Sequence, residues 1–184
     1  FTLSNRREKK LGEGDEPRTL VRSQRFQPKT MFSVFFRRSG MVHFTYMEKG
    51  KPIDSKNYIN NCIYPIIKAF YGERKTLGPK NIKFHHDNAR HHVYQSVINL
   101  LNDQKFVIMK HSPYSPDLAP CDFWLFDYIK FRLGSYNHDK SLKLGISEII
   151  DSIDKDEWIK TFDEWVVRME KCISVKSVYI QQFL

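Results

Sequence analysis

The segment NIKFHHDNARHHVYQSVINLLNDQKFVIM, Asn81–Met109, decides the fold class of this chain. Its first part, Asn81–Asp87, is typical of a short strand, and Phe106–Met109 is typical of a second, buried strand. Between them lies an apolar stripe at helical spacing, formed by Val93, Val97, Leu100 and Leu101. This order predicts two parallel strands joined by a right-handed helical crossover.

The residues before this segment predict an arm and a hairpin. Residues 1–30 are polar, charged and rich in turn-forming residues, so we expect an extended arm or long loop there. The runs Met31–Phe36 and Met41–Met47 are aromatic and β-branched, and Ser39 and Gly40 lie between them. Such runs around a short turn predict a β-hairpin.

An amphipathic helix is expected after the hairpin, with Asp54 or Ser55 as its N-cap. Its apolar face would consist of Tyr58, Ile59, Cys62, Ile63, Ile66, Ile67 and Phe70. Pro65 lies inside this stripe and predicts a kink or a break, because proline cannot donate a helical hydrogen bond.

The last third of the chain predicts a rigid loop followed by helices. The loop contains Pro113, Pro116 and Pro120. It would bring Asp122 to the first turn of a helix that runs to about Leu133. A further helix would carry the broad apolar stripe Trp158, Phe162, Trp165, Val166, Met169 and Ile173, which we interpret as core. The whole pattern predicts one α/β domain with a mixed sheet flanked by helices.

Composition limits the class of protein. A chain of 184 residues, 41% apolar and 14% aromatic, is long and apolar enough for one folded domain. No apolar run approaches the roughly 20 residues of a membrane span, and the start lacks the apolar stretch of a signal peptide. We therefore expect a soluble intracellular protein. The three cysteines are far apart and form neither a disulfide framework nor a zinc pattern.

The net charge of +9 favours a polyanionic partner. DNA is the obvious candidate, because lysines and arginines that neutralise phosphates release counterions. Simple solubility explains a basic surface as well, so charge alone favours nucleic acid only modestly.

Two acids supply the candidate chemistry. Asp87 ends the first predicted strand, Asp122 begins a predicted helix, and residues 88–121 lie between them. Carboxylates on such ends can converge on a divalent cation, which suits two-metal cleavage of a phosphodiester. Ordinary alternatives exist, since acids favour the first turn of a helix and turns. Asp117, in a predicted turn, is a rival to Asp122.

Several strings of this sequence resemble the mariner transposases of the Tc1/mariner superfamily. HDNARHH (His86–His92) and YSPDLAPCDFWLF (Tyr114–Phe126) look like the second and third catalytic-acid motifs of that family. The family has an Asp-Asp-Asp triad with thirty-four residues between the last two acids. The similarity extends from about Leu11 to the C-terminus and includes RFQPKTMFSVFF and EKGKPIDSKNYINNCIYPIIKAF. His91 and Ser112 stand where the family usually has proline.

The resemblance implies a ribonuclease-H-like fold and a metal-dependent endonuclease. Asp87 and Asp122 would be the catalytic, metal-binding acids for two Mg²⁺ (or Mn²⁺) ions. The DNA substrates would be the transposon inverted-repeat ends and a TA target for strand transfer. The resemblance also implies a homodimer, acting in the nucleus. We expect Arg18, Arg22, Arg25 and Lys29 to line the DNA path or to contact a dimer partner, and a solvated loop explains them equally well.

The resemblance also implies that a part of the enzyme is missing from the sequence. The family's first catalytic Asp, its strand and the N-terminal DNA-binding modules have no counterpart in it, and Asp15 is a poor substitute. We therefore expect this chain alone to be inactive or nearly so.

Three alternatives stay open. The chain could be an inactive or domesticated transposase-derived domain that binds DNA or a protein partner without cutting. It could also be an unrelated ribonuclease-H-like nuclease. The cluster His85, His86, His91 and His92 makes a zinc site conceivable, although the neighbouring Asp favours a hard metal.

Overall fold

A computed structural model describes residues 30–51, 53–136 and 138–175 of the protein. In chain order these residues form a hairpin, a long broken helix, a strand–helix–strand unit and three further helices. The predicted arm at 1–30 lies, apart from its last residue, outside the described residues. So do the predicted DNA-binding residues Arg18, Arg22, Arg25 and Lys29, and Asp15.

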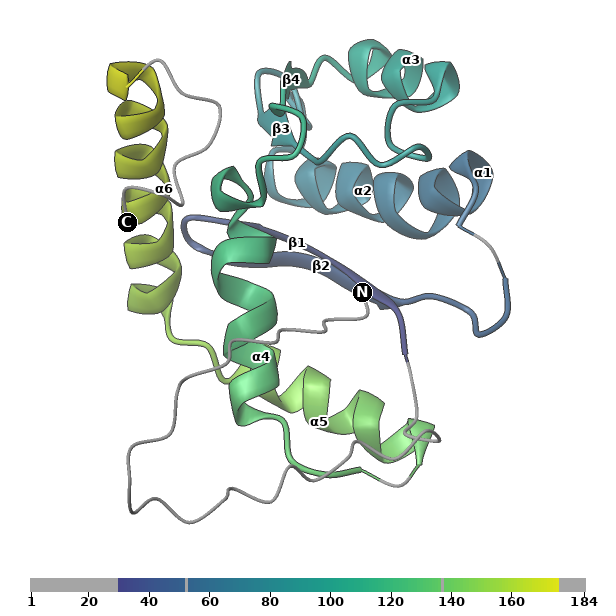
Figure 1. Ribbon diagram of the computed structural model, residues 1–184. Helices are drawn as coiled ribbons and strands as arrows, with labels where there is room; N and C mark the ends of the chain where they lie inside the picture. The colour runs from purple at the N-terminus through teal and green to yellow at the C-terminus, as the bar shows by residue number, and fades with distance from the viewer. Residues whose placement is uncertain (1–29, 52, 137, 176–184) are drawn as a thin grey trace.

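The hairpin predicted from the aromatic runs is confirmed. β1 (Phe32–Arg37) pairs antiparallel with β2 (Gly40–Tyr46), and their register shifts between Phe35 and Phe36. Gly40 has φ +129°, a conformation that side chains rarely adopt, so glycine suits this tight connection. The hairpin crosses the middle of the molecule, with α1 and α2 on one side and α5 on the other (Figure 1).

The predicted parallel pair is confirmed as well. β3 (Lys83–His85) and β4 (Val107–Met109) are parallel, and α3 (Gln95–Asp103) connects them. Both strands are shorter than predicted. Val107 is 47% exposed, because residues alternate between the two faces of a strand and only one face here meets the core. Val93 lies before α3 and is not part of its buried stripe.

The prediction of one mixed sheet was wrong for the described residues, which form two separate two-stranded sheets. The rings of Phe35 in β1 and Phe84 in β3 stack with centroids 6.0 Å apart. Side chains therefore join the two sheets, whereas no described residue hydrogen-bonds β1 to β3. Each of these strands keeps one backbone edge that no described strand covers.

The predicted amphipathic helix has three parts: α1 (Ser55–Tyr58), a π-helical turn (Ile59–Ile63) and α2 (Tyr64–Glu73). The Asp54 carboxylate accepts a hydrogen bond from the Asn57 backbone N–H at 2.7 Å, which confirms the predicted cap.

Pro65 explains the widened turn of this helix. Proline has no N–H to offer the carbonyl of Asn61, four residues earlier. The His43 ring on β2 hydrogen-bonds to that carbonyl instead, with its Nε2 2.9 Å from the oxygen. The predicted break is therefore a local widening of the helix.

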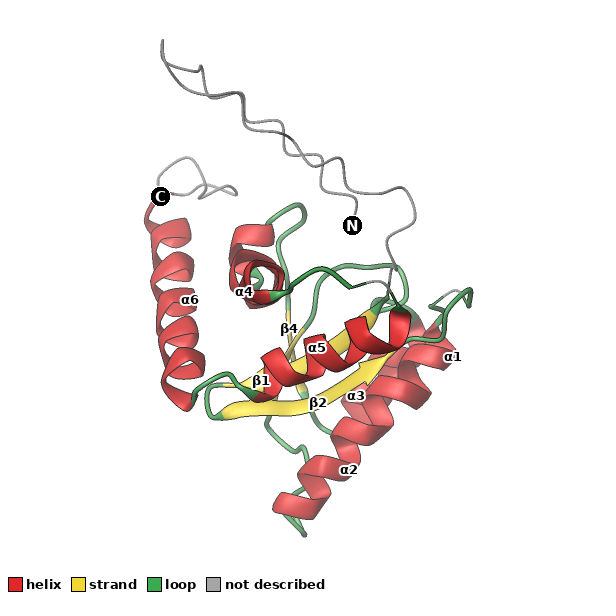
Figure 2. Ribbon diagram, turned by 90° about the horizontal axis from the view of Figure 1, so that it is seen from below, coloured by secondary structure: helices red, strands yellow, loops and turns green. Residues whose placement is uncertain are grey.

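Two apolar clusters hold the layers together. One joins α1, α2, α3 and the parallel pair to one side of the hairpin. The other lies between the hairpin, α4 (Phe126–Arg132), α5 (Asp139–Asp151) and the start of α6 (Lys155–Val175). Figure 2 shows α5 lying across the hairpin, with α6 at one end of it. Among the helices described, none combines the length and apolarity needed to cross a membrane.

The cap at Asp54 gives the first prediction. Asp54→Ala should lower the free energy of unfolding by about 1 kcal/mol, because the Asn57 N–H loses its acceptor. Asp54→Asn keeps an acceptor and is the matched control. Urea denaturation of the three proteins measures the difference, and an equal loss in both variants would contradict the capping role.

Candidate functional site

Asp87 lies in the loop after β3, two residues beyond the end of the strand at His85. The prediction that the strand extends to Asp87 was therefore wrong. The Asp87 side chain is 51% exposed. Its Oδ1 accepts hydrogen bonds from the Ala89 backbone N–H (2.9 Å) and from Nδ1 of His92 (2.5 Å). The His92 bond is the main cause that lowers the pKa of Asp87, so this acid stays charged.

Asp122 lies in a π-helical turn, Cys121–Leu125, that continues into α4. The prediction that it begins a helix is confirmed. Its backbone N–H donates to the Ala119 carbonyl at 2.9 Å. Burial, and then the negative charge of Asp87, raise the pKa of Asp122 to about 6. Widened turns of this kind are frequent at functional sites.

Asp122 is therefore close enough to Asp87 for the charge of Asp87 to raise its pKa. The fold keeps Asp87 ionised and pushes Asp122 towards its neutral form. A divalent cation between them would relieve their repulsion, and hard cations prefer such oxygen ligands. The donor chemistry thus fits a Mg²⁺-type ion. The rival Asp117 is only 1% exposed and lies inside the fold.

The histidines around Asp87 form contacts with one another. The rings of His86 and His92 stack at 5.1 Å, and Nε2 of His85 lies 3.1 Å from Nδ1 of His111. Burial lowers the pKa of His85 and of His86 to about 4, which leaves both neutral at pH 7. In the part of the chain described, no three His, Cys, Asp or Glu side chains are grouped to hold a metal. The zinc alternative thus has no ligand set there.

Trp165 of α6 supports both segments of the site. Its ring lies 4.9 Å from the His85 ring, and its Nε1–H donates to the Leu118 carbonyl at 2.8 Å. α6 therefore contacts the end of β3 and the loop that leads to Asp122. The sequence predicted Trp165 as core, and it is buried. Its link to the site depends on contacts between distant segments, which the helical stripe does not reveal.

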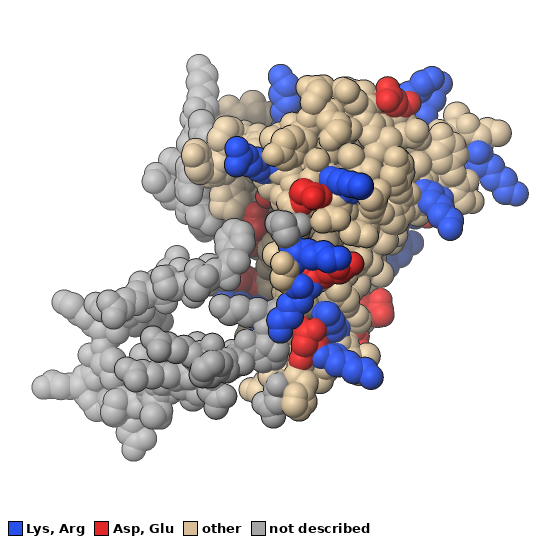
Figure 3. Space-filling model, turned by 90° about the vertical axis from the view of Figure 1, so that its right-hand side faces the viewer, with Lys and Arg blue, Asp and Glu red and all other residues tan. Residues whose placement is uncertain are grey.

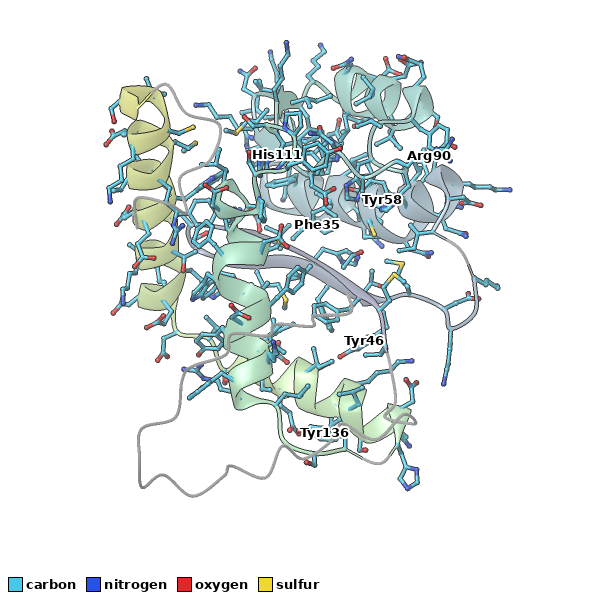
Figure 4. The ribbon with its side chains drawn as sticks, viewed as in Figure 1. Phe35, Tyr46, Tyr58, Arg90, His111 and Tyr136 are labelled. Atoms are coloured by element: carbon cyan, nitrogen blue, oxygen red, sulfur yellow. The ribbon has the colours of Figure 1, made fainter. Side chains whose placement is uncertain are left out.

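Tyr58 is a second residue that the sequence assigned only to the core. It is 1% exposed, and its ring lies 4.5 Å from the His92 ring and 5.5 Å from the His91 ring. Figure 4 shows Tyr58 on the same side of the hairpin as His111, with Tyr46 and Tyr136 on the other side. The sequence gave no signal for this contact, because an aromatic residue in an apolar stripe normally indicates packing.

The raised pKa of Asp122 predicts how stability depends on pH. The acid binds its proton more tightly in the folded state (pKa about 6) than at its ordinary value of 3.8, so the contribution of Asp122 to the free energy of unfolding should fall as pH rises from about 4 to 6. Asp122→Asn cannot titrate and should be more stable than the parent at pH 7. The expected difference is about 1–2 kcal/mol once solvent screening of this partly exposed charge is taken into account.

Urea denaturation at pH 4 and pH 7 measures this difference, which should shrink at pH 4. Asp127→Asn removes an exposed acid from the same helix and controls for loss of charge alone. A gain in stability that is equal at both pH values would contradict the assignment.

Comparisons with known proteins agree with this geometry. The family model for Transposase (partial DDE domain) matches residues 2–64. The chain is 27% identical over 186 residues to the Mariner Mos1 transposase of Drosophila mauritiana, covering 98% of this chain and 54% of that protein. It thus spans about half the length of this curated relative.

Solved structures give the same result. A Mos1 transposase paired-end complex with the left transposon end matches with a TM-score of 0.79 and 25% identity, over 96% of this chain and 52% of that chain. The Mos1 transposase catalytic domain, in a structure with raltegravir and Mg, matches with a TM-score of 0.71 and 26% identity, over 79% of this chain and 74% of that chain. These likenesses support a mariner transposase catalytic domain for this chain.

Proposed function

We propose that this chain provides two of the three metal-binding acids of a ribonuclease-H-like transposase domain. Asp87 and Asp122 would hold Mg²⁺ or Mn²⁺, with two ions in the complete enzyme. The observation that carries this proposal is that the charge of Asp87 raises the pKa of Asp122, although the two acids come from segments far apart in the sequence. The related Mos1 catalytic domain has a structure with Mg.

Each of these residues would have a separate role at such a site. The His92 hydrogen bond keeps Asp87 charged and fixes one of its oxygens. A bound cation would favour the charged form of Asp122 against burial and the charge of Asp87, which raise its pKa. Bound metal would supply activation of the attacking oxygen and stabilisation of the leaving oxygen at the phosphate.

The third acid would come from a strand that the described residues do not include. β1 and β3 each have a backbone edge that no described strand covers, and the Phe35–Phe84 stack holds the two sheets together. A strand that pairs with both edges would complete one mixed sheet and place its carboxylate beside Asp87.

DNA is the proposed substrate: transposon inverted-repeat ends for cleavage and a TA step for strand transfer. The net charge of +9 supports a nucleic-acid partner, and a matched Mos1 structure is a complex with a transposon end. Figure 3 shows Lys and Arg side chains spread over one face and interspersed with acids. We also propose that the complete protein acts as a homodimer in the nucleus, with Arg18, Arg22, Arg25 and Lys29 contacting DNA.

Cleavage by the full-length protein that contains this chain tests the proposal. With Mg²⁺ or Mn²⁺ it should nick DNA that carries its terminal repeat. Asp87→Ala and Asp122→Ala should each slow nicking by at least about 100-fold, because each removes a metal ligand. Asp127→Ala is the control and should cut normally. Retained nicking in both site variants would reject the assignment.

DNA binding by the 184-residue chain should be strongly dependent on salt. The logarithm of the binding constant should fall linearly with the logarithm of salt concentration, since each neutralised phosphate releases a counterion. Fluorescence anisotropy with a labelled duplex measures the slope. A slope near zero would show that phosphate contacts do not drive binding.

A further inference from the structure

The hydroxyl of Tyr58 is an unusual feature of the core. The residue is 1% exposed, and no described residue offers its oxygen a hydrogen bond. Burying a hydroxyl without a partner costs free energy that a phenylalanine of the same shape would avoid. Packing therefore explains the Tyr58 ring but leaves its hydroxyl without a role in the fold.

The surroundings of this hydroxyl connect it to the acids. The Tyr58 ring contacts the ring of His92, and His92 holds Oδ1 of Asp87. After burial and Cys62, the charges of Asp87 and Cys121 raise the pKa of Tyr58. Cys121 directly precedes Asp122 in its π-helical turn. The Tyr58 ring thus packs beside the histidine that holds Asp87, and its hydroxyl feels the charges of both segments that carry the acids.

The helix that carries Tyr58 is anchored at this place on both sides. Asp54 caps its first turn four residues before Tyr58. His43 binds the Asn61 carbonyl in the π-helical turn that follows. The tyrosine side chain therefore has a fixed direction, which a positioning role requires.

We propose that Tyr58 is a positioning residue of the metal site formed by Asp87 and Asp122. Its hydroxyl donates a hydrogen bond to an oxygen atom that is bound to the metal. This inference rests on the proposed function of the two acids. Groups that orient the ligands of a metal typically change its affinity 10- to 100-fold when they are removed. No described residue pairs with this hydroxyl in the protein without metal. The protein would bear that free-energy cost, and the hydroxyl would form its hydrogen bond when metal binds.

Two tyrosine variants test this proposal against a purely structural role. Tyr58→Phe removes the orphaned hydroxyl, whereas Tyr46→Phe removes one that donates to the Lys143 carbonyl and shares a hydrogen bond with Ser147. Thermal unfolding without metal gives their stabilities. Electron paramagnetic resonance of free Mn²⁺ during titration of the 184-residue chain gives its affinity.

Tyr58→Phe should raise Tm by about 2–4 °C and weaken Mn²⁺ binding by about 10-fold or more. Tyr46→Phe should lower Tm by a similar amount and leave Mn²⁺ binding unchanged. A Tm that falls in Tyr58→Phe would show that the fold already pairs this hydroxyl and would overturn the proposal. Unchanged Mn²⁺ affinity in Tyr58→Phe would overturn it as well.

Asp87→Ala in the same titration separates this inference from the proposed function. If Asp87→Ala abolishes Mn²⁺ binding and Tyr58→Phe does not weaken it, the metal site stands and the role of Tyr58 fails. If the parent and Asp87→Ala bind Mn²⁺ equally or not at all, the metal site itself fails and Tyr58 fails with it.

Discussion

Repulsion between Asp87 and Asp122 is the constraint on which the site depends. Two carboxylates brought together in a partly buried place do not both ionise freely, and this fold makes them unequal. Asp87 is half exposed and held by His92 and the Ala89 N–H, whereas Asp122 lies deeper in a helical turn. Placing the two carboxylates together costs the protein free energy when no cation is bound. A cation of charge +2 would relieve this repulsion and would bind more tightly because of it.

Neighbouring segments oppose this repulsion. The Asn88 side chain donates to the His111 carbonyl at 2.9 Å, which ties the loop of Asp87 to the chain after β4. Trp165 holds the next turns of that chain through the Leu118 carbonyl. Polar bonds and an aromatic contact from α6 therefore keep the two acid-bearing segments together, although no described strand spans the space between the two sheets.

Local patterns were sufficient to predict much of this molecule. The hairpin, the cap at Asp54, the parallel pair and the helix that begins near Asp122 all follow from short-range rules, and the structure has each of them. The approach of the loop of Asp87 to the chain after β4 follows from topology, because loops after parallel strands meet at one edge of the fold. The separation into two sheets was not predicted, because apolar runs indicate that a segment forms a strand without indicating which strand it pairs with.

The contacts of Trp165 and Tyr58 near the acids could not be predicted from the sequence, for a related reason. Trp165 and Tyr58 each lie in an apolar helical stripe, and such a stripe predicts burial without naming the neighbours. Their contacts with His85 and His92 join residues about eighty and thirty-four positions apart in the sequence. The widening at Ile59–Ile63 was anticipated only as a kink, because the compensating contact from His43 is also long-range.

The two π-helical turns also affect how gene copies of this protein can diverge. Each turn holds one residue more than an ordinary helical turn, and the widening absorbs that residue. Loss of a single codon within Ile59–Ile63 would return the turn to an ordinary helix, and at about 100° per residue Ile66 and Phe70 would stay on the face they share with Tyr58. Elsewhere in these helices the same loss would rotate everything that follows by about 100°, so the two widened turns are the places where the helices can best accept a one-residue deletion.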